Sequence, residues 1–326
     1  MSIRERTYWL SGAARLRRKD DSLVFELADG NRVPVPVTDI ADIITTAPVD
    51  INTATMALLR QHEIAVHVLD HYGNYAGMVA PASDHCSGEI VRKQVLAAED
   101  PKRRNVIARA FVVATAFNVR WVLGREQLDS SYNRFVEAVG RTESPAELMA
   151  AEGNFRRSCW ALLDTKLPDW LCLHGRSRRP PANPANAFVS FVNSLIYSRA
   201  LTAIRLTPLH PGIGFLHTTM ARRRFTLALD LAEHFKPIFA ERLLLRSAHQ
   251  RSLTLADFDC EANASLLSEA GRKKVLAMVR DELDSTVYHR GLKRKVRYEE
   301  LFHLEALKLV RTFLEDQPFK PFKVWW

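Results

Sequence analysis

The sequence predicts an α+β protein in which a small N-terminal β-rich domain is followed by a larger, mostly α-helical domain. Short runs rich in β-branched and aromatic residues recur through the first 80 residues, and turn signals such as Asp29-Gly30 separate them. From residue 89 onward, apolar residues recur at helical spacing. We therefore expect a β-rich domain over 1–80, a linker over 81–88 and a helical domain over 89–326.

Within the β-rich part, strands are expected at 7–10, 23–27, 32–37, 42–45 and 64–69, and one helix at 52–61. Pro34 and Pro36 cannot donate hydrogen bonds to a neighbouring strand, so the third run is expected at the edge of a sheet. The basic run 15–19 is expected in a turn between strands.

Helices are expected at 102–122, 144–163, 186–201, 227–246, 269–284 and 297–314. The segment Ser144-Pro145-Ala146-Glu147 has the pattern of a helix start. Ser144 is expected to cap the helix, Pro145 suits its first position, and Glu147 completes a capping box.

Composition bounds the class of protein. The 326 residues have a formal net charge of +9, which favours a polyanionic partner such as nucleic acid, although many basic proteins carry only solvated charge. No apolar run of about 18 residues and no secretory signal are visible, so a membrane protein is not expected. The four cysteines form no C-x-x-C pair. They are expected to be ordinary buried side chains of a cytoplasmic protein.

Three segments of the chain together offer a candidate metal site. Asp230 and Glu233 share one face of a predicted helix, His217 ends a glycine-containing loop, and Glu152 lies beside Gly153. Each segment taken alone is more often a solvated acidic face, a core histidine or an unremarkable helix. Taken together, two carboxylates and an imidazole suit Mg²⁺ or Mn²⁺, and the absence of thiolates disfavours zinc.

Several motifs in a fixed order make the sequence recognisable. They are Ala151-Glu152-Gly153, the stretch from Arg178 to Asn186, Gly214-Phe215-Leu216-His217 and the run from Leu227 to Glu233. Glu152 and His217 are 65 residues apart, and His217 and Glu233 are 16 apart. In these motifs and over nearly its whole length, the chain resembles the CRISPR adaptation integrases, metal-dependent DNA endonucleases that insert new spacers into CRISPR arrays.

The resemblance implies functions for particular residues. The family's metal ligands fall on Glu152, His217 and Glu233, and Asp230 becomes an accessory ligand or a group that supports the ligands. The reaction would be attack by a 3′-hydroxyl of a captured double-stranded DNA fragment on a phosphodiester of the repeat. The family acts as homodimers bridged by a small second CRISPR adaptation protein. The β-rich domain is then the expected dimerisation element.

Basic clusters near the motifs are the expected DNA contacts: Arg176, Arg178, Arg179, Arg222, Arg223, Arg224 and Lys236. The run 15–19 is expected to be solvated instead. The C-terminal aromatic tail is expected to pack on the helical domain rather than stack on bases. The chain departs from the family at Asn183, where Asp is usual, at Asn193, where Tyr is frequent, and at Lys236, where Arg is common. Lys236 therefore lacks the bidentate geometry of a guanidinium.

Two alternatives stay open. One is a stand-alone metal-dependent nuclease that cleaves branched or single-stranded DNA without integrating it. The other is a DNA-binding scaffold without catalytic activity.

Overall fold

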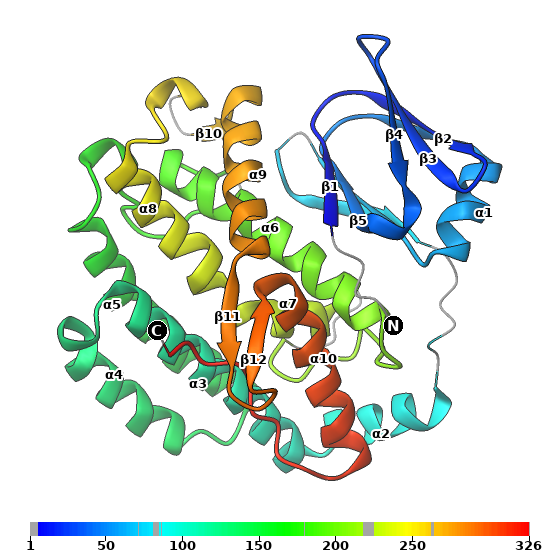
Figure 1. Ribbon diagram of the computed structural model, residues 1–326. Helices are drawn as coiled ribbons and strands as arrows, with labels where there is room; N and C mark the ends of the chain where they lie inside the picture. Colours follow the sequence, from blue (N-terminus) through cyan, green and yellow to red (C-terminus); the bar gives the residue numbers. More distant parts are fainter. Residues whose placement is uncertain are drawn as a thin grey trace. The chain divides into compact units, whose positions relative to one another are not determined.

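The computed structural model describes residues 6–70, 72–80, 85, 87–178, 180–217, 225–261 and 264–325. The chain divides into two compact units, Met1–Asp84 and His85–Trp326. The first is rich in strands and the second is mostly helical (Figure 1). The predicted fold class is confirmed.

Unit 1 holds two four-stranded sheets and one helix. In the first sheet, β1 (Arg6–Leu10), β5 (Ile40–Thr45) and β7 (Ala65–Leu69) run parallel, and β8 (Tyr75–Val79) pairs antiparallel with β7. The second has the order β4 (Arg32–Pro36), β3 (Ser22–Leu27), β2 (Ala14–Lys19) and β6 (Val49–Ile51). The helix α1 spans Thr53–Gln61, and Asn52 caps it by accepting a hydrogen bond from Thr55 N. Side chains of both sheets and of α1 share one core, which includes Leu16, Ile43 and Leu58.

The five expected strands are present, and β4 lies at a sheet edge, as its prolines require. The expectation of a turn at 15–19 is wrong, because this run forms most of β2, between β3 and β6. Ala14 and Leu16 point into the core, and Arg15 and Lys19 face solvent. The alternation that defines a half-buried strand was therefore present, but its outward positions are all basic.

Unit 2 is built from nine α-helices among the residues described. They are α2 (Gly88–Glu99), α3 (Pro101–Leu123), α4 (Arg125–Gly140), α5 (Pro145–Asp164), α6 (Pro184–Arg205), α7 (Thr226–Glu233), α8 (Arg242–Gln250), α9 (Glu269–Asp284) and α10 (Tyr298–Leu314). Short turns η2 (Asp169–Leu171), η3 (Pro237–Glu241) and η4 (Leu255–Asp257) join some of them. Two small hairpins, β9–β10 (Phe258–Glu261, Ala264–Leu267) and β11–β12 (Thr286–His289, Arg294–Arg297), interrupt the helices.

Three long helices of this unit begin in the same way. Asp100, Ser144 and Asn183 each accept a backbone hydrogen bond as the N-cap, and a proline follows each at the first helical position. This pairing satisfies an orphan N–H and supplies a residue whose own missing N–H costs nothing there. The Glu147 side chain accepts a hydrogen bond from Glu143 N at 2.9 Å, one residue before the expected capping-box partner.

Helix α6 is the centre of unit 2. Seventeen of its side chains are buried, and α7, η3 and α10 pack around it. Helices α3, α4 and α5 contact one another and lie side by side (Figure 1). By length and composition α3 and α6 could cross a membrane, but 56% and 78% of their apolar windows are buried within the protein.

One expected helix is divided in two. The segment predicted as a single helix over 227–246 contains α7, then the π-helical turn η3, then α8. Pro237 explains the break, because its ring clashes with the preceding turn and it has no N–H to donate. Helices α2 and α4 and both hairpins were not predicted.

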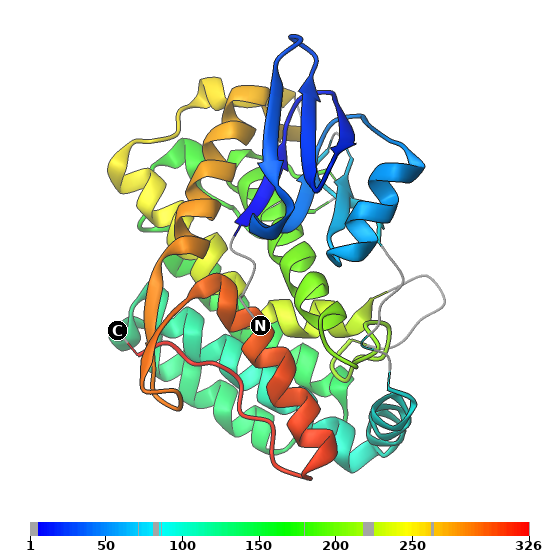
Figure 2. The same ribbon diagram turned by 45° about the vertical axis from the view of Figure 1, so that its right-hand side comes forward.

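The C-terminal tail packs on unit 2, as expected. Phe319, Phe322 and Val324 are buried, and Asn118 bonds to the backbone of the tail at Phe322 and Val324. Figure 2 shows the tail (red) turning back across the helices after α10. Cys159 and Cys172 are buried as expected, Cys260 is exposed against expectation, and Cys86 lies outside the described residues.

Candidate metal centre

Glu152, His217 and Glu233 come from separate segments of unit 2. Glu152 lies two turns into α5, Glu233 is the last residue of α7, and His217 belongs to the loop between α6 and α7. Their charges act on one another, since Glu233 raises the pKa of Glu152 and His217 lowers it. His217 Nε2 is 3.8 Å from Glu233 Oε1. The fold therefore brings the three side chains into one neighbourhood.

Asp230 organises the loop that carries His217. Its carboxylate is fully buried and accepts hydrogen bonds from the backbone N–H groups of Phe215, Leu216 and His217, at 2.6, 3.0 and 2.9 Å. A fourth bond joins Asp230 Oδ1 to His217 Nδ1 at 2.7 Å. Because four hydrogen-bond donors surround this carboxylate, its oxygens hold the loop in place. This arrangement suits a group that positions His217 better than one that binds a metal directly.

Gly214 allows this loop to close on α7. A Cβ added at Gly214 would lie 2.8 Å from the backbone carbon of Thr226 and 2.9 Å from Asp230 Oδ2. The Thr226 hydroxyl bridges the loop by accepting from Gly214 N at 2.9 Å and donating to the Gly212 carbonyl at 2.8 Å. Only glycine fits here without moving helix or loop, which explains the glycine three residues before His217.

The hydrogen bond to Asp230 fixes the tautomer of His217. An ionised carboxylate only accepts, so Nδ1 carries the proton and the lone pair of Nε2 faces the Glu233 side. Burial opposes a charge on this ring, but the bond to Asp230 and the charges of Glu233 and Asp230 outweigh it, and the pKa of His217 lies above its ordinary value. A carboxylate behind an imidazole is the support usually found behind a metal-ligating histidine.

The two glutamates differ in their protonation. Burial, followed by repulsion from Glu233, raises the pKa of Glu152 to about 7. Burial also disfavours charge on Glu233, but the nearby charges of Lys236 and His217 prevail, and its pKa is lowered. The Lys236 ammonium forms an ion pair with Glu233 Oε1. Two acids that repel each other beside an oriented imidazole form a site that a cation would stabilise.

The ligands are not preassembled around one point. Within the parts of unit 2 that the structure describes, which exclude 218–224, no three His, Cys, Asp or Glu side chains are arranged to hold an ion. Lys236 is the present cationic partner of Glu233. The donor set nevertheless fits a hard or borderline divalent ion, since it offers two carboxylates and one imidazole nitrogen.

A buried ion pair close to Glu152 was not predicted from the sequence. Arg156 lies one turn after Glu152 on α5 and pairs with Glu241 of η3, and both side chains are almost fully buried. The charge of Arg156 also lowers the pKa of Glu152 against the effect of burial. The i, i+4 spacing of Glu152 and Arg156 was a visible signal, but Glu241 could not be paired with it before η3 was known.

The expected DNA-contact residues fall into three groups. Arg178 is exposed, whereas the Arg176 guanidinium is directed inward, to Asn186 Oδ1 at 2.8 Å and Ser190 Oγ at 3.0 Å. Lys236 pairs with Glu233. Arg179, Arg222, Arg223 and Arg224 lie outside the described residues.

Of the residues that depart from the expected family pattern, Asn183 has well-defined structural partners, whereas the side-chain oxygen of Asn193 is buried without one among the residues that the structure describes. Asn183 caps α6 through Asn186 N and donates to the Leu173 carbonyl at 2.8 Å. Its amide supplies both an acceptor and a donor at this position, whereas an ionised Asp would supply acceptors alone.

Fold and site together define a helical unit with a candidate divalent-metal centre for phosphoryl-transfer chemistry, preceded by a strand-rich unit. The family described as CRISPR associated protein Cas1 matches residues 7–281. The CRISPR-associated endonuclease Cas1 2 of Moorella thermoacetica is 37% identical over 324 residues, which are 98% of this chain and 100% of that relative. The chain belongs to the Cas1 family.

Solved structures agree in fold. A Cas1 protein from Thermotoga maritima superposes with a TM-score of 0.88 at 31% identity, covering 98% of this chain and 100% of that one. A casposase bound to its integration product has a TM-score of 0.86 at 19% identity, covering 98% of this chain and 94% of that one. The second likeness concerns the fold alone.

Proposed function

We propose that this chain is a metal-dependent DNA endonuclease and integrase that inserts captured DNA fragments, as spacers, into a CRISPR array in antiviral defence. Membership of the Cas1 family supports this function. The observation that carries it is the Asp230–His217–Glu233 arrangement, in which a buried carboxylate aims an imidazole nitrogen at a second acid.

Glu152, His217 and Glu233 are the proposed ligands of one Mg²⁺ or Mn²⁺ ion. Such an ion, when bound, polarises a phosphate oxygen and stabilises the charge on the leaving oxygen. Glu233 would exchange the Lys236 ammonium for the ion, and Glu152, whose pKa is about 7, would give up its proton. Lys236 would then be available to a phosphate.

The chain's own groups set the geometry of the reaction. Asp230 keeps the Nε2 lone pair of His217 directed at the site, and the Arg156–Glu241 pair ties α5 to η3, on either side of the ligands. The 3′-hydroxyl of the captured fragment attacks a repeat phosphodiester. One P–O bond forms, one breaks, and the displaced 3′-oxygen takes up a proton. Fixing the reacting groups in this way lowers the entropic part of the barrier.

Contacts outside the centre complete the proposal. Exposed Arg178 binds duplex phosphates together with Arg179, Arg222, Arg223 and Arg224, and Arg176 supports this stretch from below through Asn186 and Ser190. A cytoplasmic homodimer, with unit 1 as its dimerisation element and a small second CRISPR adaptation protein as its bridge, would present two centres to the two ends of one fragment.

A strand-transfer assay tests the function. A fluorescent duplex with free 3′-hydroxyls is incubated with a supercoiled plasmid carrying the repeat, the second adaptation protein and Mg²⁺ or Mn²⁺. We expect the label to join the plasmid. Glu152→Gln and His217→Ala should each reduce joining by at least about a hundredfold, as loss of a metal ligand or of a catalytic charge commonly does. Glu137→Gln, an exposed change on α4, is the matched control.

The same assay separates the alternatives. A stand-alone nuclease would cut branched or single-stranded DNA in the presence of metal and leave the plasmid unlabelled. A scaffold without catalysis would bind DNA and process none, and full metal-dependent activity in both ligand variants would overturn the assignment of the centre.

A further inference from the structure

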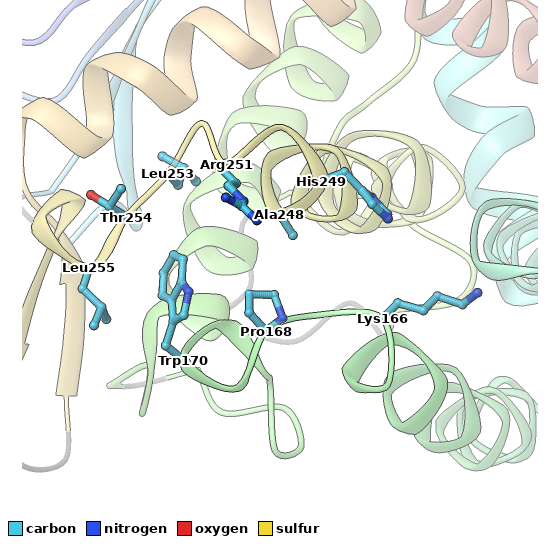
Figure 3. Close-up of a pocket in the computed structure, with 9 residues that line it drawn as sticks. All are labelled: Lys166, Pro168, Trp170, Ala248, His249, Arg251, Leu253, Thr254 and Leu255. Atoms are coloured by element: carbon cyan, nitrogen blue, oxygen red, sulfur yellow. The ribbon is translucent and has the colours of Figure 1, made fainter.

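A pocket lies at the far end of the two helical segments that carry the candidate ligands. Its volume is about 500 Å³, within the range of roughly 300–1,000 Å³ typical of small-ligand sites. One wall is the connection from α5 to η2, and the other runs from the end of α8 to η4 (Figure 3). The lining residues are Lys166, Pro168, Trp170, Ala248, His249, Arg251, Leu253, Thr254 and Leu255.

One part of this pocket is aromatic and apolar. Trp170 is half-buried and is held at its edge by Phe258, with ring centroids 6.2 Å apart and the planes at 65°. Leu253 is buried beneath, and Leu255 is 54% exposed beside the indole. Figure 3 shows Trp170 standing between Leu255 and Pro168. An exposed aromatic face flanked by apolar groups suits a flat partner such as a nucleobase.

The remainder of the lining is basic. Lys166, His249 and Arg251 line the pocket, and among the lining residues that the structure describes none is acidic. The nearest acids along the chain are Asp164, Asp169 and Asp257. Asp164 accepts hydrogen bonds from Leu173 N and His174 N, and Asp257 pairs with Lys274. His249 Nδ1 is 2.9 Å from the Leu245 carbonyl oxygen, so it carries the proton and leaves Nε2 for a ligand. Cations beside an aromatic face suit a ligand that joins a base to a phosphate.

The backbone conformation at Arg251 decides which variant can test the charge of this residue. Arg251 ends α8 with φ +52° and ψ +35°, in the left-handed region where glycine is the usual residue. A non-glycine residue in this conformation costs of order 1 kcal/mol. Glycine at this position therefore relieves the strain of the backbone while it removes the charge of the side chain.

The pocket is separate from the metal centre, but the same segments of the chain lead from the candidate ligands to the pocket. Glu152 and Asp164 are both on α5, about 18 Å apart along the axis at roughly 1.5 Å per residue, and Lys166 follows Asp164 by two residues. Glu233 ends α7, and the chain then continues through η3 and α8 to His249 and Arg251.

We propose that this pocket binds one unpaired nucleotide of a single-stranded DNA segment, with the base on Trp170 and the adjoining phosphates on Arg251, His249 and Lys166. The choice of DNA rests on the proposed function. The pocket would hold an unpaired part of the substrate at a fixed distance from the reacting phosphodiester.

Binding without metal tests the pocket by itself. The full chain in EDTA is titrated with a fluorescent oligothymidylate, and the salt dependence of affinity is recorded. Arg251→Gly should weaken binding by at least about fivefold and lower the slope of log affinity against log salt by about 0.7, the value for one lost phosphate contact on a single strand. The variant relieves the left-handed strain, so its fold should be retained.

Lys293→Gly is the matched control. Lys293 is also exposed, also has φ +52°, and also loses one positive charge, but it lies on the β11–β12 connection outside the pocket. Trp170→Ala should weaken binding by about fivefold or more, and Trp170→Phe should restore most of it, because a stacked base contributes at least that factor. Equal affinities of Arg251→Gly and Lys293→Gly, within twofold, would overturn the proposal.

Photo-crosslinking locates the nucleotide. An oligonucleotide with one 5-iodouracil is irradiated on the protein, and we expect a crosslinked peptide that contains Trp170. Cross-links that map only to other segments would contradict the site. A blunt duplex should give no such cross-link, and thymidine monophosphate should compete only weakly. Competition by the mononucleotide as strong as that by the oligonucleotide would assign the pocket to free nucleotides.

The two proposals fail in different ways. If strand transfer with metal is absent but the Trp170 cross-link forms in EDTA, the integrase assignment fails and the nucleotide pocket stands. If strand transfer proceeds but Trp170 never cross-links and Arg251→Gly binds like Lys293→Gly, the pocket proposal fails by itself.

Discussion

The carboxylates of Glu152, Asp230 and Glu233 have different roles because their neighbouring groups differ. Asp230 accepts four hydrogen bonds, Glu233 pairs with Lys236, and Glu152 is a half-buried acid that Glu233 repels. The pKa of Glu152 is about 7, near neutrality, whereas that of Glu233 is lowered. The proton of Glu152 therefore competes with metal in the range where the protein works.

This competition predicts a pH-dependent metal affinity. Because the metal needs the ionised carboxylate, Mn²⁺ affinity should fall by up to about tenfold per pH unit below pH 7 and level off above it. Titrations followed by Mn²⁺ electron paramagnetic resonance between pH 6 and 8 would measure this. In the metal-free protein the raised pKa means that folding takes up a proton between the ordinary value of 4.5 and 7, so this group destabilises the fold above pH 7 and ceases to do so as the pH falls toward 4.5.

Glu152→Gln is the control for that titration. The amide cannot ionise, so the variant should bind Mn²⁺ weakly and have a shallower pH dependence, which comes from His217 alone because its pKa is also raised. A wild-type affinity that is flat from pH 6 to 8 would contradict the assignment of Glu152 as a ligand.

Asp230 predicts a combined loss of stability and metal binding. Asp230→Asn replaces an acceptor of four hydrogen bonds by a group that presents two N–H donors to buried donors. We expect a loss of about 2 kcal/mol or more in the free energy of unfolding, and metal binding weaker by about 10- to 100-fold. Urea unfolding and Mn²⁺ titration measure the two effects. Asp129→Asn, at the half-exposed Arg120–Asp129 pair, should cost less than about 1 kcal/mol.

At the scale of elements, the centre depends on how one loop and three helical segments meet. Gly214 lets the loop approach α7, Pro237 ends the helix after Glu233, and the π-helical turn η3 then places Glu241 against Arg156. Irregular turns of this kind are frequent at functional sites. Here the break turns a single predicted helix into two segments with different tasks.

Two glycine variants should have opposite effects. Gly214→Ala brings a Cβ within 2.8 Å of the Thr226 backbone and 2.9 Å of Asp230 Oδ2, so we expect a loss of about 1–3 kcal/mol in the free energy of unfolding. At Gly153, inside α5, a Cβ meets nothing within 4 Å, and Gly153→Ala should stabilise by about 0.5–1 kcal/mol. Denaturant unfolding of both variants checks the pair, and a stabilised Gly214→Ala would refute the tight approach of loop and helix.

At the scale of the whole molecule, charge is divided between the two units. Residues 1–84 contain 8 Lys and Arg and 11 Asp and Glu, a net charge of −3. The whole chain has a net charge of +9, so the remaining 242 residues have a net charge of +12. A polyanion is attracted by unit 2, which also contains the candidate metal centre, and the basic strand β2 of unit 1 belongs to a sheet of an acidic unit.

This division predicts where charge reversal affects DNA binding. Arg178→Glu in unit 2 should weaken duplex binding several-fold at moderate salt and reduce the salt dependence of affinity, because one or more phosphate contacts are lost. Lys19→Glu in unit 1, an equal change of charge at an exposed position, should leave affinity within about twofold. Fluorescence anisotropy over a salt series measures both. Equal losses in the two variants would show that general charge, and not this surface, controls binding.

Patterns that act over short distances were readable in the sequence. The fold class, five strands of unit 1 and the proline-led start of α5 follow from alternation, helical periodicity and capping chemistry, all of which involve neighbouring residues. Strand β2 was not predicted because basic residues at its outward positions concealed the alternation. The break at η3 was not predicted because Pro237 lies within a segment that otherwise has helical periodicity.

The order and spacing of motifs also determined the family and the three candidate ligands, because a relative's motif can be matched without knowing how the chain folds. Tertiary structure alone decided that Asp230 holds the loop of His217 and that Arg156 pairs with Glu241. It also decided that Lys236 forms an ion pair with Glu233 and that Trp170 and Arg251 line the same pocket. Each of these involves residues from different segments whose contact depends on packing, and hydrogen-bond direction and burial then fix protonation.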